Sequence, residues 1–238
     1  MKRTWLISAA LLLIACSSFA QQASNSTGSQ KEHAAPATPA RSADAVWNDL
    51  AAGNKRFVAG KSNSHDVVEL RKKLASGQSP EVIILSCSDS RVSPEIVFDQ
   101  SLGDLFVVRT AGNIADRVGL GSIEYAVDHI HSPLLVVLGH QKCGAVTAAC
   151  SGEKMPSVNL EAIVDKIGPA VETAKKSAKG DELIESAIKQ NVHQSAKDLM
   201  SNSEIISDAV KSGKLRIVEA EYQLESGEVV RLDSAAQY

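Results

Sequence analysis

The fold is decided by residues 82–91, which read VIILSCSDSR. The first four residues form a continuous apolar run, which predicts a strand over 81–88 that is buried on both faces, as in a parallel sheet. Cys87, Asp89 and Arg91 follow at the exit of that strand, and alternate residues of an extended chain share a face. The stretch therefore predicts a buried strand that delivers a thiol, a carboxylate and a guanidinium to one edge of a sheet.

A second cluster, His140 and Cys143, follows another apolar run at 134–138. Further strands are predicted at 105–109 and 215–222. Helical periodicity predicts a first helix over 46–59 and further helices between the strands, among them a long one that carries Ile184, Ile188, Val192 and Leu199. Strands that alternate with helices indicate an α/β fold with right-handed crossovers. We expect a mostly parallel central sheet flanked by helices, with an antiparallel edge strand or hairpin near the C-terminus, where Gly227 follows the fourth strand.

The two clusters predict a metal site, because ligands gather at the carboxyl ends of parallel strands. Cys87, His140 and Cys143 offer two sulfurs and one nitrogen, which is a zinc ligand set. The fourth ligand of the metal would be either Asp89 or water. If Arg91 holds the Asp89 carboxylate off the metal, water enters, and zinc makes hydroxide available near neutral pH.

The chain of 238 residues begins with a predicted secretory signal over 1–20, in which Lys2 and Arg3 precede an apolar run. That run is too short to span a bilayer, which takes about 20 apolar residues. Two cleavage patterns compete. Cleavage after Ala20 would free the protein, whereas a lipoprotein signal ending at Ala15 would leave Cys16 lipidated and anchor the chain to a membrane. Either pattern predicts export to a bacterial periplasm.

Composition separates a tether from a domain. Residues 21–44 are rich in Gln, Ser, Ala, Thr and Pro, which predicts a disordered tether, and residues 45–238 are enough for one domain. The net charge of −3 and the lack of basic runs argue against a nucleic-acid partner.

The cysteine count argues against a disulfide framework. The chain has four cysteines, and Cys16 lies in the signal, so three remain, and an odd number does not suit a closed set of disulfides. We expect two metal thiolates, with Cys150 in the core.

Together the clusters resemble those of the β-class carbonic anhydrases. The likeness rests on Cys-Ser-Asp-Ser-Arg-Val at 87–92 and Gly-His-x-x-Cys-Gly at 139–144, and it covers about 50–232. It includes Gly53-Asn54-x-Arg56-Phe57, the stretch 107–113, the stretch 123–127 before the third strand, and the closing strand and hairpin at 213–227.

The resemblance implies an enzyme with one zinc ion per subunit, held by Cys87, His140 and Cys143 beside an Asp89–Arg91 dyad. It implies reversible hydration of carbon dioxide to bicarbonate and a proton by zinc-bound hydroxide. It also implies a homodimer or homotetramer with active sites near the subunit interface.

Several single residues match substrate-pocket positions in the plant-type branch of the β-class carbonic anhydrases. Gln78 matches a glutamine that hydrogen-bonds substrate, and Gly144 matches a backbone N–H donor beside the metal. Phe106 and Tyr125 match an aromatic wall, although ordinary core packing is an equal alternative for both. With Phe106, Ala111 is expected to shape the substrate channel.

Ile84 stands where another branch carries the Trp of an inhibitory bicarbonate site, so we expect no such site.

Two other functions stay open. One is hydrolysis of carbon disulfide or carbonyl sulfide on the same fold, and the other is a non-catalytic zinc or redox-sensing protein with Asp89 permanently on the metal. His129 and His131 are interpreted as a solvated helix end rather than a proton relay.

Overall fold

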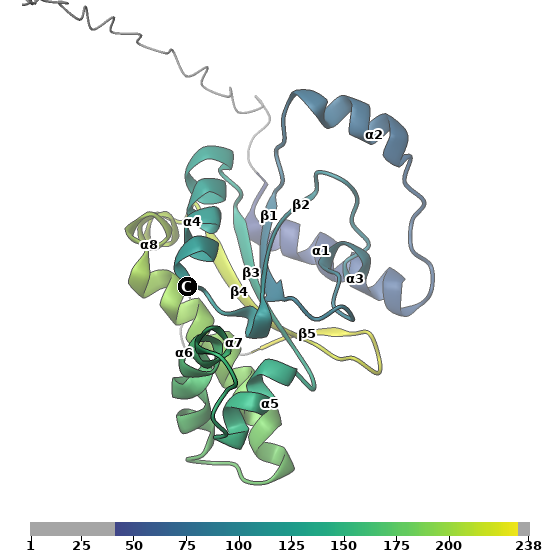
Figure 1. Ribbon diagram of the computed structural model, residues 1–238. Helices are drawn as coiled ribbons and strands as arrows, with labels where there is room; N and C mark the ends of the chain where they lie inside the picture. Colours follow the sequence, from purple (N-terminus) through teal and green to yellow (C-terminus); the bar gives the residue numbers. More distant parts are fainter. Residues whose placement is uncertain (1–40, 233–238) are drawn as a thin grey trace, which may run out of the picture. The chain divides into compact units, whose positions relative to one another are not determined.

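Five strands in the order β2-β1-β3-β4-β5 form the central sheet of the computed structural model, which describes residues 41–232 (Figure 1). The strands are β1 (Val82–Cys87), β2 (Leu105–Thr110), β3 (Leu134–His140), β4 (Arg216–Tyr222) and β5 (Val229–Arg231). The first four run parallel, and β5 pairs antiparallel with β4. The predicted fold class, including the hairpin near the C-terminus, is confirmed.

Burial along the strands follows their place in the sheet. All residues of β1 and β3, the inner strands, are buried, which explains their continuous apolar runs. By contrast, β2 forms one edge of the sheet, and five of its six residues are half-buried while Arg109 is exposed. The long apolar runs thus mark the centre of the sheet, and the edge strand carries the mixed pattern.

Helices cover both faces of the sheet. They are α1 (Ala43–Val58), α2 (Val67–Lys73), α3 (Pro94–Val97), α4 (Arg117–Tyr125), α5 (Gly144–Ser151), α6 (Val158–Ala174), α7 (Asp181–Asn202) and α8 (Glu204–Lys211), with short helical turns η1 (Leu74–Ser76), η2 (Ala111–Asn113) and η3 (Ala126–Ile130). One face packs against α4, α7 and α8, and the other packs against α1 and α3 (Figure 1).

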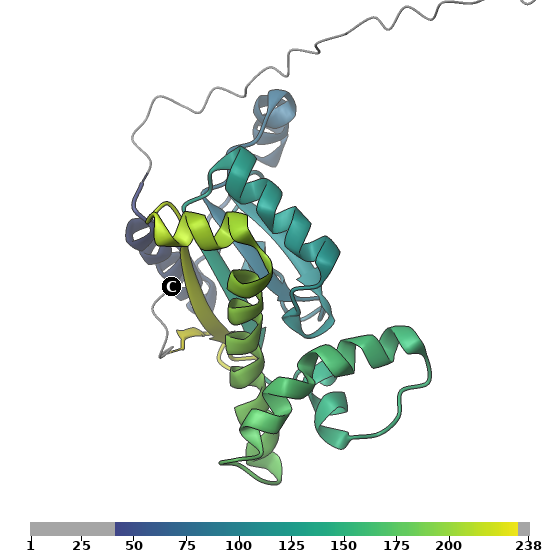
Figure 2. The ribbon, with the colours of Figure 1, turned by 90° about the vertical axis from the view of Figure 1, so that its left-hand side faces the viewer.

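The helices α5, α6 and α7 meet beyond the carboxyl ends of the strands (Figure 2). A third apolar cluster lies between these helices. It contains Cys87 and Cys143 together with Ile167 and Ile188, and all four side chains are buried. Apolar side chains therefore surround the two sulfur atoms. They lie at the carboxyl ends of the strands, where ligands bind in α/β folds.

Two local features differ from the sequence-based expectation. The first helix begins at Ala43 rather than at 46, because the Ser42 side chain accepts a hydrogen bond from the backbone N–H of Ala45 and caps the helix there. The helix after the second strand ends in the π-helical turn η3, which periodicity does not reveal. Within residues 41–232, no helix is both long and apolar enough to cross a membrane.

Candidate metal centre

Three buried side chains converge at the carboxyl end of the sheet. Cys87 ends β1, His140 ends β3, and Cys143 is the N-cap residue of α5. Their ligand atoms all lie within 4.8 Å of one another. The parallel pairing of β1 with β3 brings together residues that are more than fifty positions apart in the sequence.

The donor atoms fit a metal ion. His140 Nδ1 lies 2.8 Å from the carbonyl oxygen of Gln141, and because a carbonyl only accepts, Nδ1 carries the proton. Nε2 is then left with a free lone pair, and this buried atom has no hydrogen-bond partner among residues 41–232. The Sγ atoms of Cys87 and Cys143 are 4.0 Å apart. An unpartnered nitrogen beside two sulfurs is the arrangement that zinc prefers.

The two thiols do not ionise alike. The pKa of Cys87 is lowered because its sulfur accepts a hydrogen bond from Cys143, and the Gly112 N–H lowers it further against the effect of burial. The pKa of Cys143 is raised because its thiol donates to Cys87 and because burial and the neighbouring charge oppose a second thiolate. The pair alone therefore favours one negative charge, and a divalent cation would stabilise both thiolates.

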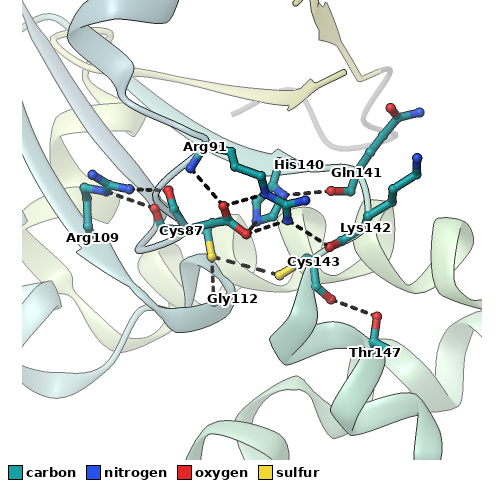
Figure 3. A network of polar contacts seen from close by, with 10 residues as sticks. Cys87, Arg91, Arg109, Gly112, His140, Gln141, Lys142, Cys143 and Thr147 are labelled. Atoms are coloured by element: carbon teal, nitrogen blue, oxygen red, sulfur yellow. Dashed lines mark hydrogen bonds and ion pairs between the residues drawn. The ribbon is translucent and has the colours of Figure 1, made fainter. Parts of the chain in front are cut away.

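Asp89 is paired with Arg91 beside these ligands (Figure 3). Its Oδ1 accepts from the backbone N–H and the Nε of Arg91 at 3.0 and 2.9 Å, and its Oδ2 accepts from Nη2 at 2.7 Å. The Arg91 guanidinium holds the pKa of this carboxyl well below its usual range. Asp89 Oδ2 is 3.9 Å from His140 Nε2, so the carboxylate borders the ligand set while Arg91 occupies both of its oxygens.

Arg109 braces the backbone that carries Cys87 and Asp89. Its Nε donates to the Cys87 carbonyl at 2.9 Å, and its Nη2 donates to the Asp89 carbonyl at 2.6 Å (Figure 3). Sequence reasoning included Arg109 in a resembling stretch but gave it no role. The sequence does contain a signal for this role, because Arg109 is the one charged residue of β2 and follows four apolar residues.

Comparisons with known proteins agree with this geometry. The family model described as "Carbonic anhydrase" matches residues 82–229. The chain is 42% identical to "Carbonic anhydrase 2" of Mycobacterium tuberculosis, over 79% of this chain and 92% of that protein. The solved structure of the β-carbonic anhydrase CcaA superposes with a TM-score of 0.63 at 30% identity, covering 79% of this chain and 95% of that one. The chain belongs to the β-carbonic anhydrase family. A structure of tetrameric β-carbonic anhydrases from Sordaria macrospora matches with a TM-score of 0.64 at 25% identity, covering 80% and 95%.

Two of the predicted pocket residues of this β-carbonic anhydrase lie at the metal centre. Ala111 opens η2, the turn whose next residue donates its N–H to the Cys87 sulfur. Gly144 is the first residue of α5, directly after Cys143. The exposed N-terminus of a helix offers backbone N–H groups that have no partner within the helix, so Gly144 is placed where such a donor would be needed.

The other three pocket residues are not brought to the centre within one chain. Phe106 pairs with Ile83 near the start of β1, whereas Cys87 lies four residues further along, about 13 Å at 3.3 Å per residue. The rings of Phe106 and Tyr125 are 6.2 Å apart, and Tyr125 is 48% exposed. Gln78 is exposed and precedes the amino end of β1.

Three residues that were not assigned to catalysis, Cys150, His129 and His131, lie in the core or at the surface. Cys150 is half-buried in α5 and packs against the apolar cluster around Ile167, and burial raises the pKa of its thiol. His129 is exposed and stacks on Tyr125 with ring centroids 4.9 Å apart, and His131 is exposed at the end of η3.

Proposed function

We propose that this chain catalyses the reversible hydration of carbon dioxide to bicarbonate and a proton, with one zinc ion per subunit held by Cys87, His140 and Cys143. The observation that carries the proposal is a buried ligand set of two sulfurs and one nitrogen beside a carboxylate whose oxygens are occupied by an arginine. Zinc bound there would act as a Lewis acid and provide a nucleophile from water near neutral pH.

The protein groups around the ligands orient the reactants. Arg91 keeps Asp89 charged throughout the neutral range and fixes the direction of its carboxylate, so Asp89 can accept a hydrogen bond from the attacking water. The N–H groups at the start of α5, beginning with Gly144, can donate to an oxygen of the product as negative charge develops there. Ala111 contributes an apolar wall, which suits a substrate without charge.

The Asp89–Arg91 pairing also bears on the non-catalytic alternative. A closed structural site would need a fourth protein ligand, and Asp89 is the neighbouring candidate. Both of its oxygens accept from Arg91 instead. This geometry favours a centre with an exchangeable fourth position, and hence an enzyme.

Stopped-flow measurement of carbon dioxide hydration tests the proposal, with zinc content measured on the same samples. We expect activity to disappear with a chelator and to return with zinc. Cys87→Ser should lose both zinc and activity, whereas the matched control Cys150→Ser should keep both. Activity that survives complete zinc removal would contradict the proposal. Faster turnover of carbonyl sulfide than of carbon dioxide would favour the alternative hydrolase.

We propose further that a homodimer completes the substrate pocket, and that two dimers can form a tetramer. The argument is that Gln78, Phe106 and Tyr125 lie away from the metal centre of their own chain, at or near the exposed edge strand β2. A second copy packed across this edge can bring its own three residues to the centre of the first chain. The tetrameric relatives in Sordaria macrospora are consistent with such an assembly.

Subunit complementation tests the shared pocket. Cys87→Ser and Gln78→Ala would each be weakly active alone. In a mixed dimer, the chain with intact Cys87 receives an intact Gln78 from its partner, so co-refolded mixtures should exceed the average of the two parents. Mixtures that are combined without refolding serve as the control. Activity equal to that average, or a monomeric mass by light scattering, would refute the shared pocket.

We also propose export to the periplasm, with either release after Ala20 or lipidation of Cys16; both positions lie outside the described residues. Support comes from the basic and apolar segments of residues 1–20. Mass spectrometry of the mature N-terminus in cell fractions distinguishes the two. Intact Met1 in the cytoplasmic fraction would contradict export.

A further inference from the structure

The turn η2 donates a hydrogen bond to a sulfur of the proposed metal centre. The backbone N–H of Gly112 lies 3.3 Å from Cys87 Sγ, in a buried position (Figure 3). A donor of this kind withdraws charge from a thiolate, and hydrogen bonds to ligating sulfur tune the properties of metal centres. The placement of this turn therefore bears on how strongly Cys87 donates to a metal.

Two side chains of α7 hold the turn. Asn191 Nδ2 donates to the carbonyl of Gly112 at 2.7 Å, and Ser195 Oγ donates to the carbonyl of Asn113 at 3.0 Å. The side chains are four residues apart and so share one face of the helix. Both are almost fully buried, at 1% and 3% exposure. Burying polar groups is costly unless they are bonded, and these two bond to successive carbonyls of one turn.

The turn needs such outside support because its backbone is unusual. Gly112 and Asn113 both have positive φ, at 73° and 46°. A side chain at position 112 would meet Ile167 at 2.8 Å and Ala145 at 3.2 Å, so α5 and α6 confine the turn as closely as α7 does. Non-glycine residues persist in this region of φ only where the surroundings determine it.

We propose that Asn191 is a positioning residue which, through Gly112, aims a hydrogen bond at the Cys87 sulfur and thereby tunes it as a metal ligand. Ser195 supports the same turn from one helical turn away. The inference rests on the proposed zinc-dependent function. Its physical reason is the ligand set itself, because two thiolates place more negative charge on a metal than imidazoles do, and an N–H donor to one sulfur offsets part of that charge.

The test uses the full chain with cobalt(II) in place of zinc, because the sulfur-to-cobalt charge-transfer band reports the electron density on sulfur. Asn191→Leu keeps the branched shape of the side chain, although the methyl groups are larger than the amide, and it removes the donor. We expect its band to shift to lower energy, and kcat/KM of the zinc enzyme to fall by about 10-fold or more, the usual cost of losing an outer-shell partner. Ser195→Ala should shift the band in the same direction by less, and Ser195→Thr, which keeps the hydroxyl, should restore it.

Leu199→Val is the matched control, because Leu199 is a buried apolar residue of the same helix, two turns beyond Asn191, and its side chain has no hydrogen-bond donor for the turn. It should leave both the band and kcat/KM unchanged. An unshifted band in Asn191→Leu, or in Ser195→Ala if the first variant does not fold, overturns this inference alone. A wild-type protein that shows no sulfur-to-cobalt band, or no hydration with zinc, overturns the proposed function and this inference with it.

Discussion

Gly139→Ala should destabilise the wild-type protein but not a protein that already carries Val192→Ala. Gly139 precedes His140 in β3 and faces α7, where an added Cβ would lie 2.4 Å from Val192 Cγ2. Carbon atoms in contact are normally about 3.5–4.0 Å apart, so the helix and strand must separate by about 1 Å or more. Val192 is fully buried and β-branched, so it has little freedom to turn away.

The expected magnitudes follow from the neighbouring atoms. Overpacking of this kind costs about 1–3 kcal/mol. Val192→Ala alone removes two methyl groups at about 0.8 kcal/mol each and leaves a cavity. Without Val192, the closest atoms to the new Cβ are Asn113 Oδ1 and Ile188 Cγ2, both at 3.8 Å, which is ordinary contact. In that background, Gly139→Ala should therefore stabilise by about 0.5–1 kcal/mol, through the loss of glycine's backbone entropy.

A double-mutant cycle measured by urea unfolding tests this reasoning, at one protein concentration because oligomer stability depends on it. We expect the two changes to couple favourably by about 2–3 kcal/mol, near the upper end for residues in contact. Hydration activity should fall in Gly139→Ala and recover in the double variant, since the same displacement would move α7 away from His140. Additive free energies would refute the close contact between Gly139 and Val192.

Three further outcomes are expected. Asp89→Ala should retain zinc but lower hydration activity, and an unchanged rate from neutral to alkaline pH would contradict the role given to the dyad. Arg109→Met should lower kcat/KM by about 10-fold, as loss of an outer-shell contact does, with Arg109→Lys in between because it keeps one donor; equal rates would show that the brace is dispensable. Burial raises the pKa of Glu221, so its charged form opposes folding above the ordinary carboxyl range and not below it. Glu221→Gln should therefore raise the urea midpoint at pH 8 with no gain near pH 4, and identical midpoints at pH 8 would contradict this.

Sequence patterns predicted the parts of this fold that depend on local composition. The apolar runs that became β1 and β3 indicated burial on both faces, and Cys87 and His140 fell at the strand ends because strands are short and bounded by polar residues. The start of α1 was placed three residues late, since the capping role of Ser42 lies outside the apolar periodicity.

The sequence pattern did not predict contacts between residues that are far apart in the chain. The periodicity of α7 predicted an amphipathic helix, but it could not show that Asn191 meets the carbonyl of Gly112, which is 79 positions away. Likewise, the resemblance assigned Phe106 to the aromatic wall of the substrate pocket, but it could not show that the register of β1 and β2 places Phe106 at the other end of the strand from Cys87 of the same chain. Both cases depend on how separate elements pack, and one sequence carries no direct record of that.

The ligand set has a thermodynamic consequence for the whole fold. Cys87 belongs to one strand, and His140 and Cys143 belong to another strand and the helix after it, so an unfolded chain does not present the three together. A metal that binds only the assembled set stabilises the protein by mass action, by about 1.4 kcal/mol for each tenfold rise in free metal above the dissociation constant. The free energy of unfolding of the enzyme should thus follow the free metal concentration of its surroundings, and a chelator should lower the unfolding midpoint as well as the activity.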